Sequence, residues 1–347
     1  MKAWGGRDDG PSDREETLKA IEEAGIDLDP TGERSAGHDH DATPHSHPHV
    51  TSRPGEPPVV GIVGAGAVGT ALGVALDRAG WPIHAVASRD PGRRERFRSL
   101  VPVNRAFSDA TQLVEEVELI VLAVPDDAIR QVAGEVRMYG GQAMIHTSGL
   151  LGADALAAAM AAGTQVGSFH PLVAFADLER AVAALHGATI AIEGDDQLLD
   201  LLARMAEAIG ATAVRLAPGS KPSYHAAAVL AAGGVDGLLD AIVELGRLAG
   251  LDEAGSLAIY GPLVEQTLAN ARALGIDRAL TGPATRGDLG TIAAHLAEID
   301  AHAPAVAPLY EALAQREIAI AERRGSLTPE AAADLLAAAD RALATPD

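Results

Sequence analysis

The chain has 347 residues, of which 48% are apolar but only 3% aromatic, so its cores must consist mainly of Ala, Leu, Val and Ile. It contains no cysteine, which excludes disulfides, thiolate nucleophiles and zinc sites built on Cys. The net charge of −21 disfavours nucleic acid and anionic membranes as partners, so a site for an anionic ligand needs its own positive charge. Because there is neither a signal-peptide pattern nor an uninterrupted apolar run of about 18 residues, the sequence predicts a cytoplasmic protein without a membrane span.

Residues 1–57 are predicted to be a tail outside the folded part. A short acidic helix is expected from Ser12 to about Gly25. The stretch 27–58 is rich in Pro, Gly, His and acidic residues and has almost no apolar ones, which predicts disorder. Five histidines of this stretch are potential ligands of a transition metal: His38, His40, His45, His47 and His49. The composition favours a solvated linker instead, and no metal site is predicted.

From Pro58 onward, short apolar runs alternate with helical periodicity. Strands are expected at 59–63, 82–88, 118–124, 142–146, 165–169, 188–192 and 212–216, with helices at 68–79 and 93–100 among them. This alternation predicts an α/β Rossmann domain, a doubly wound parallel sheet with right-handed crossovers, over 58–218. After Pro218 only helical periodicity remains, at 221–249, 253–274, 287–300, 304–324 and 329–344. An all-α domain over 219–347, for substrate binding and dimerisation, is therefore expected.

A glycine-rich turn follows the first predicted strand and opens the first helix. Gly64 permits a tight turn, Gly66 lets a pyrophosphate approach the backbone, and Gly69 allows close packing of helix on strand. The helix N-terminus adds the positive end of its dipole. A turn without function is the alternative, which the strand–turn–helix context disfavours. The predicted cofactor loop comprises Gly64, Ala65, Gly66, Ala67, Val68 and Gly69.

The end of the second predicted strand indicates which dinucleotide is bound. An NAD site places an acidic residue there to accept from the ribose hydroxyl, whereas this chain has Ser88 and Arg89, with Arg93 and Arg94 close behind. Ser88 can donate to a 2′-phosphate, and Arg89 can stack on adenine and neutralise that phosphate. Asp90 is the counter-evidence, one position further on, and a solvated helix start is the structural alternative. The sequence predicts NADP(H).

Three further strand ends carry polar or helix-starting residues. Ligands of open α/β sheets bind at the carboxyl ends of strands, so Val124, Pro125 and Ser148 are expected to line the cofactor. Pro171 keeps His170 extended, which places its imidazole at the rim of the site. Each of these residues can instead serve only as a cap or a turn residue.

Four stretches in this order give the chain a family resemblance: Val124-Pro125-Asp126-Asp127, Ser168-Phe169-His170-Pro171, Tyr224-His225-Ala226-Ala227-Ala228 and Thr281-Gly282-Pro283-Ala284-Thr285-Arg286-Gly287-Asp288. Over about 59–330 the chain resembles bacterial proteins that join a Rossmann-like domain to a helical domain of unknown function. That family is similar to ketopantoate reductases, pyrroline-5-carboxylate reductases and prephenate dehydrogenases. The resemblance implies reduction of a small 2-oxo acid, such as 2-dehydropantoate to pantoate. The chain departs from the family at Gly233-Gly234, where an Asn is expected.

Lys221 stands out because the chain has only three lysines and the other two lie in the tail. Unlike arginine, a buried lysine can lose its proton, so Lys221 is a candidate general acid or polariser of a carbonyl. Tyr224 and His225 share its helix face, and His225 is an alternative proton relay. A surface lysine and a buried, hydrogen-bonded histidine are the structural alternatives.

A second cluster surrounds the loop 282–290. Arg286 is a candidate for holding a substrate carboxylate bidentately, with Asp288 beside it. Alternatively, Asp288 caps the following helix and pairs with Arg286. His295, seven residues on, shares the helix face of Asp288 and either lines the pocket or is a partly buried helix residue.

Two classes of function remain. The first is an NADPH-dependent reductase of a small carbonyl compound, with a cyclic imine reductase or a prephenate-type dehydrogenase as variants. The second is a non-catalytic module that senses NADP(H). An enzyme needs Lys221 and Arg286 at the nicotinamide, whereas a sensor needs only the glycine loop and the basic residues 88–94. Because helical domains of this kind commonly pair through long helices, a homodimer is also predicted.

Overall fold

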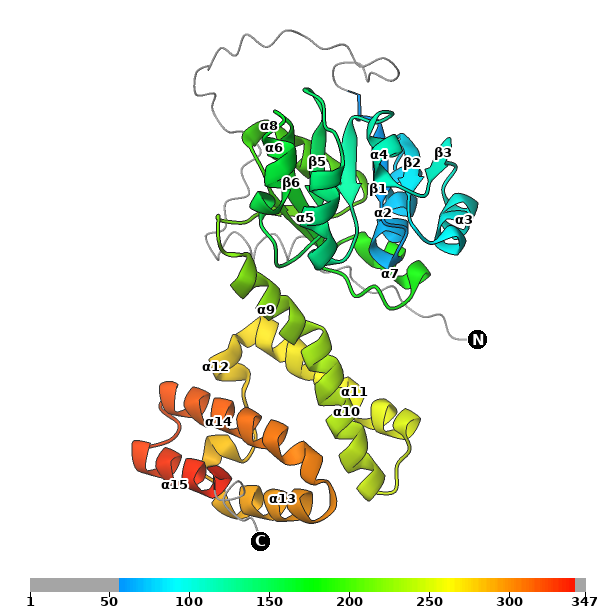
Figure 1. Cartoon of the computed structure of the whole chain (residues 1–347). Helices are drawn as coiled ribbons and strands as arrows, with labels where there is room; N and C mark the ends of the chain where they lie inside the picture. The colour runs from blue at the N-terminus through cyan, green and yellow to red at the C-terminus, as the bar shows by residue number, and fades with distance from the viewer. Residues whose placement is uncertain (1–55, 341–347) are drawn as a thin grey trace, which may run out of the picture. The chain divides into compact units, whose positions relative to one another are not determined.

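The computed structural model describes residues 56–340, which form parts of two compact units, Met1–Ala228 and Val229–Asp347 (Figure 1). The predicted tail helix and the histidine-rich stretch lie outside the described residues. The sequence-based boundary was placed at residue 218, whereas the unit boundary follows Ala228, so Lys221, Tyr224 and His225 belong to the first unit.

The first unit alternates strands and helices almost throughout. Its strands are β1 Val60–Val63, β2 Ile83–Ala87, β3 Arg105–Phe107, β4 Leu119–Leu122, β5 Ala143–His146, β6 Gln165–Pro171, β7 Thr189–Glu193 and β8 Thr212–Arg215. Its helices are α2 Ala67–Arg78, α3 Pro91–Leu100, α4 Ala110–Val114, α5 Asp126–Glu135, η1 Ala153–Leu156, α6 Ala157–Met160, α7 Leu178–Leu185, α8 Asp196–Ala208 and α9 Lys221–Ala231, whose last residues pass into the second unit. The predicted α/β architecture is confirmed.

The strands form one sheet in the order β3-β2-β1-β4-β5-β6-β7-β8. The first six are parallel, as predicted, but β7 pairs with β6 in antiparallel register, His170 opposite Ala191, and β8 runs parallel to β7. The prediction of a wholly parallel sheet is therefore wrong for these two strands. The short helix α7 contacts α2 instead of carrying the chain back across the sheet, so β7 starts from the edge where β6 ends.

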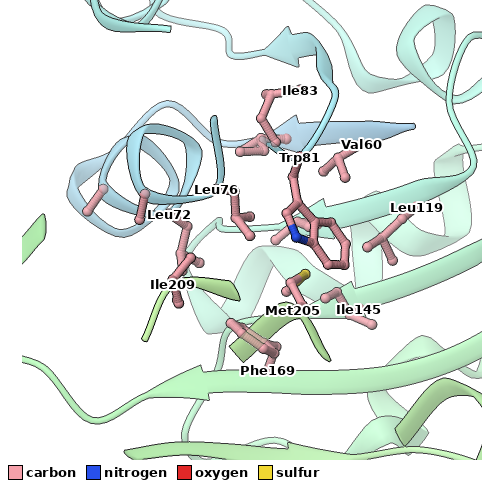
Figure 2. Packing of buried hydrophobic residues seen from close by; sticks show 14 of the residues in the cluster. Val60, Leu72, Leu76, Trp81, Ile83, Leu119, Ile145, Phe169, Met205 and Ile209 are labelled. Carbon is pink, nitrogen blue, oxygen red and sulfur yellow. The ribbon is translucent and has the colours of Figure 1, made fainter. Parts of the chain in front are cut away.

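Side chains alternate between the two faces of the sheet, as the period of a strand requires. Val60 and Ile62 of β1 join a cluster with helices α2, α3, α7 and α8, which includes Trp81 and Phe169 (Figure 2). Val63 lies in a second cluster, with α4, α5 and η1–α6. The first unit is thus a three-layer sandwich, and its core is aliphatic as the composition predicts.

The second unit is helical. Its elements are α10 Gly233–Leu248, α11 Glu253–Leu274, α12 Ile276–Ala279, η2 Ala284–Arg286, α13 Leu289–His302, η3 Pro304–Val306, α14 Ala307–Arg323 and α15 Pro329–Asp340. A small core forms where α13, α14 and α15 pack, around Ile292, Ile318 and Leu335. The single helix predicted over 221–249 is interrupted at Ala232, immediately before the glycine pair, so α9 and α10 are separate elements.

One segment among the described residues, Lys221–Leu248, is long and apolar enough to cross a membrane by length and composition alone. Its mean hydropathy is 1.7, and 6% of that window is buried. Three acidic residues one turn apart, Asp236, Asp240 and Glu244, give it a charged side, and Lys221 at its start is buried in the first unit. A single helix of this kind is weak evidence for a membrane span.

Candidate functional site: the cavity at the carboxyl edge of the sheet

The glycine-rich turn between β1 and α2 is built as the motif predicts. Gly64 has φ +108°, which L side chains rarely adopt. A Cβ on Gly69 would lie 2.0 Å from the carbonyl oxygen of Gly64, so helix and strand need a residue without a side chain there. Around Gly66, in contrast, no heavy atom beyond Gly66 itself and its two chain neighbours lies within 4 Å of an ideal Cβ position. The backbone at Gly66 therefore faces open space at the N-terminus of α2, which is the geometry of an anion-binding turn.

At the end of β2 the side chains divide into two roles. The Asp90 carboxylate accepts from the amides of Gly92 and Arg93, at 2.8 and 3.1 Å, and thereby caps α3. Arg94 donates to the backbone carbonyl of Ser88. Ser88 and Arg89 line the neighbouring cavity, Arg89 with an exposed side chain. Asp90 thus caps its own helix and its Oδ2 lies 3.6 Å from Arg93 Nε, but it also lines the cavity, so its carboxylate stays beside Ser88 and Arg89.

A cavity of ≈ 780 Å³ lies along the carboxyl ends of β1, β2, β4 and β5. Eleven of the twelve residues predicted to bind a cofactor line this cavity: Gly64, Ala65, Gly66, Ala67, Val68, Ser88, Arg89, Arg93, Val124, Pro125 and Ser148. Gly69 is buried behind the turn. His170 and His225 also contribute to the lining. The structure therefore brings most of the predicted site residues together in one place.

Two histidines and a tyrosine form the inner end of the cavity. His170 Nδ1 lies 3.0 Å from the Tyr224 hydroxyl, and the rings of His170 and His225 meet edge to face at 5.7 Å between centroids. A Cβ on Gly149 would lie 2.7 Å from His170 Nε2 and 2.4 Å from His225 Nδ1. The two imidazoles therefore converge on the bare backbone of Gly149.

The protonation state of His170 follows from its surroundings. Burial, together with the smaller effects of nearby Lys221 and His225, lowers the pKa of His170 to about 4 against an opposing effect of Asp126. His170 is accordingly neutral at pH 7. Burial also raises the pKa of the Tyr224 phenol, which keeps its proton. The Nδ1 atom of His225 is buried and has no hydrogen-bond partner among the described residues.

Lys221 does not line the cavity. Its side chain is 2% exposed, and Nζ donates to the backbone carbonyl of Ser148 at 2.7 Å. Burial lowers the pKa of Lys221 to about 8, while Glu193 and Asp126 act in the opposite direction. The surface lysine considered from the sequence is excluded, and the cavity wall is formed instead by the loop to which Lys221 is bonded.

Three predicted site residues belong to the second unit. Asp288 accepts from the amide and the hydroxyl of Thr291, at 3.1 and 2.8 Å, and these bonds lower its pKa. It is the N-cap of α13, as the structural alternative proposed. Arg286 is exposed at the end of η2, and His295 contacts the Tyr310 hydroxyl at 2.8 Å.

Sequence reasoning missed several residues around the cavity. Asp126 was noted at a strand end and in the family resemblance but was given no role of its own, yet it accepts from the Ser148 hydroxyl at 2.7 Å. His146 is fully buried and bonds within its own loop, to Ser148 and Gly152, whereas Gly149 is approached by imidazoles from β6 and α9. The only signal for them was their position at strand ends. Among residues 56–340 no group of three or more metal-binding side chains occurs, and the histidine-rich stretch lies outside this range.

Family models match the chain in two places. The model of a Rossmann-like domain matches residues 51–171, and that of a domain of unknown function (DUF2520) matches residues 188–317. The chain carries both domains. The second match begins at β7, so the family boundary falls inside the sheet and not at its end. No curated protein matches the chain.

Solved structures with the same fold cover most of the chain. A candidate NADP oxidoreductase from Bacteroides fragilis is 22% identical, with a TM-score of 0.64, over 76% of this chain and 98% of that one. A Thermotoga maritima protein is 25% identical, with a TM-score of 0.59, over 76% and 99%. A reductive aminase from Aspergillus terreus, in complex with NADPH and ethyl levulinate, is 16% identical, with a TM-score of 0.60, over 80% and 98%. The combination of sheet domain and helical domain is thus an established fold.

Proposed function

We propose that the protein is an NADP(H)-dependent oxidoreductase that reduces a small carbonyl compound. The observation that carries this proposal is the open backbone cradle at Gly66, which shares one cavity with Ser88 and Arg89. Two of the similar structures bear names that include NADP or NADPH, which supports the same cofactor here.

The residues present fit this cofactor. A pyrophosphate needs amide donors and free space above the turn, and a side chain at Gly66 would fill that space. A 2′-phosphate needs hydrogen-bond donors and positive charge, which Ser88, Arg89 and Arg93 supply. Asp90 also lines the cavity, but its carboxylate caps α3 and pairs with Arg93, which offsets its charge. We therefore assign the adenosine end to the end of β2 and the nicotinamide end to His170 and His225.

When bound, NADPH supplies a hydride. The chain must then hold the substrate and handle the proton that the developing alkoxide takes up. His170, oriented by the Tyr224 hydroxyl, can hold the substrate oxygen by a hydrogen bond, because it is neutral and faces the cavity. His225, with an unpartnered Nδ1 beside it, is the proposed relay for the proton. Asp288 is not included, because its carboxylate caps α13.

The proposed substrate is a 2-oxo acid, with 2-dehydropantoate as the first compound to test because of the family resemblance. Arg286 is the proposed anchor of its carboxylate. The similarity to a reductive aminase favours an imine as the second candidate substrate. A prephenate-type dehydrogenase and an NADP(H) sensor without turnover are further alternatives.

Cofactor binding is tested with Arg89→Ala. Loss of a charge-assisted hydrogen bond should weaken NADPH binding about 10- to 100-fold and leave NADH binding unchanged. Arg98→Ala is the matched control, because Arg98 lies on α3, the helix that follows Arg89, pairs with Glu95 and is not part of the cavity lining. Titration of NADPH fluorescence measures both affinities. Absence of binding by either dinucleotide in the unaltered protein contradicts the proposal.

Turnover is tested by following NADPH absorbance with a panel of 2-oxo acids and cyclic imines. Oxidation that His170→Ala slows at least about 10-fold, with NADPH affinity retained, is the expected result. Tight NADPH binding without oxidation of any compound would support the sensor.

A second copy of the chain is the proposed partner. Helices α10 and α11 expose large apolar side chains: Val235, Leu248, Leu257, Ile259, Leu263, Leu268 and Leu274. Ile259 and Leu263 lie one turn apart on α11, and exposed apolar side chains grouped in this way are typical of a protein interface. With a net charge of −21 the chain repels itself, so an uncharged face is where two copies can meet. The charged side formed by Asp236, Asp240 and Glu244 argues against lipid around α10.

A further inference from the structure

The loop 147–152, which follows β5, is held mainly by side chains. The Ser148 hydroxyl donates to Asp126 Oδ2 at 2.7 Å and accepts from the amides of Leu150 and Leu151, at 3.1 and 3.0 Å. It therefore closes a turn and ties that turn to the first residue of α5. Thr147, Ser148 and Gly149 line the cavity, so the shape of this loop is the shape of the cavity wall.

His146 supports the same loop from inside the sheet. Its Nδ1 accepts from the Ser148 amide at 3.2 Å, which leaves Nε2 as the donor to the carbonyl oxygen of Gly152 at 3.0 Å. Both ring nitrogens are thus used, and the ring is completely buried. The loop is held at Ser148 and at Gly152 by one neutral imidazole.

Lys221 adds the bond that joins this loop to another element. Its ammonium reaches from the first residue of α9 to the carbonyl oxygen of Ser148, across 73 positions of sequence. The same helix carries Tyr224 and His225 one turn later. One charged hydrogen bond therefore fixes the helix that bears His225 against the loop that bears Gly149, where the two imidazoles converge.

Two carboxylates act on the buried Lys221 ammonium and oppose the effect of burial on its pKa. Asp126 and Glu193 both interact electrostatically with it, and Asp126 accepts from the Ser148 hydroxyl. A neutral side chain would leave these carboxylates without their nearby cation. Since Lys221 does not line the cavity, transfer of its proton to a bound substrate would require the Ser148–Gly149 segment to move aside.

We infer that Lys221 is a positioning residue whose buried ammonium clamps the loop 147–152 to α9 and thereby sets the spacing of His170 and His225 at the cavity wall. This inference rests on the proposed function for its catalytic meaning. The clamp itself is a property of the protein without ligand and can be tested separately.

The test compares Lys221→Met, Lys221→Arg and the unaltered protein by hydrogen–deuterium exchange of the cofactor-free chain. In Lys221→Met the amides of Leu150 and Leu151 should exchange about ten-fold faster. In Lys221→Arg, which keeps the charge and the donors but cannot release a proton, protection should largely return. Ser223→Ala is the control, because Ser223 lies on the same turn of α9 and bonds only to the Ser220 carbonyl. NADPH affinity, measured in parallel, should fall several-fold in Lys221→Met only.

The outcomes separate the two proposals. Unchanged exchange in Lys221→Met overturns the clamp, and loss of turnover with intact exchange would identify Lys221 as a proton donor. If Lys221→Met does not fold, the exchange of the loop 147–152 in Lys221→Arg tests the clamp instead. A protected loop in Lys221→Arg supports the clamp, and fast exchange of the loop in folded Lys221→Arg overturns it. If the protein binds no NADPH but exchange follows the expected pattern, the proposed function fails while the clamp stands.

Discussion

The imidazole of His146 makes two hydrogen bonds and has no exposed surface, and this environment keeps it uncharged. A second proton would have to go on Nδ1, which already accepts from the Ser148 amide. Independently of that bond, burial lowers the pKa of His146 to about 4. In the unfolded chain the pKa of the same side chain is near 6.5. Between pH 6.5 and pH 4, protonation of His146 therefore favours the unfolded state.

This opposition predicts a pH dependence of stability. As the pH falls from 6.5 to 4 the unfolded state binds a proton that the folded state refuses, so the free energy of unfolding decreases by about 2 to 3 kcal/mol for His146. His146→Gln should reduce this decrease, whereas His302→Gln, at an exposed position, should not. Urea unfolding at pH 7 and pH 4.5, followed by the fluorescence of the buried Trp81, measures the difference. Identical pH dependence in His146→Gln and the unaltered chain would contradict the assignment.

At the scale of elements, the strand–turn–helix unit β1–α2 combines a packing requirement with a ligand requirement. A Cβ on Gly69 would lie too close to the carbonyl oxygen of Gly64 to fit, whereas a Cβ on Gly66 would lie in open space. Both glycines belong to one motif, and the sequence correctly predicted a separate role for each. The structure adds that the two roles can be tested separately.

Two alanine substitutions should therefore have opposite profiles. Gly69→Ala should lower the free energy of unfolding by about 2 kcal/mol or more, because the new methyl group meets backbone that cannot move freely. Gly66→Ala should change it by less than about 1 kcal/mol and yet weaken NADPH binding at least about ten-fold, since its methyl group occupies the cradle. Thermal unfolding and fluorescence titration distinguish them. Retained affinity in Gly66→Ala would argue against a pyrophosphate at this turn.

Other elements were less accessible to sequence reasoning. The strand β3 was missed, because its three residues include two exposed ones and show no apolar run. The direction of β7 was mispredicted, because apolar strands that are buried on both faces look alike in either direction. The break between α9 and α10 coincides with Gly233-Gly234, which was noted only as the absence of an expected Asn.

At the scale of the whole molecule, the exposed apolar side chains of α10 and α11 predict a homodimer. Ile259 and Leu263 lie one turn apart and are 56% and 59% exposed. The double substitution Ile259→Glu, Leu263→Glu should give a monomer at micromolar concentration, because a dimer would bury four new carboxylates. Leu313→Glu, at an exposed apolar position of α14, is the matched control. Sedimentation velocity measures the mass. A monomeric unaltered chain, or its flotation with phospholipid vesicles, would contradict the dimer.

The sequence by itself determined the α/β architecture, the helical second unit and the cofactor loop, because periodicity and glycine spacing are local properties of the chain. It also predicted that residues 64–69, 88–93, 124–125 and 148 would lie at one edge, since parallel strands end there together. Tertiary structure alone decided that Lys221 is buried against Ser148 and that Asp90 is engaged as a cap. It likewise decided that His170 and His225 meet at Gly149. The Lys221–Ser148 and His170–Tyr224 hydrogen bonds join positions more than 50 residues apart, and no local pattern encodes which distant side chain will fill a given space.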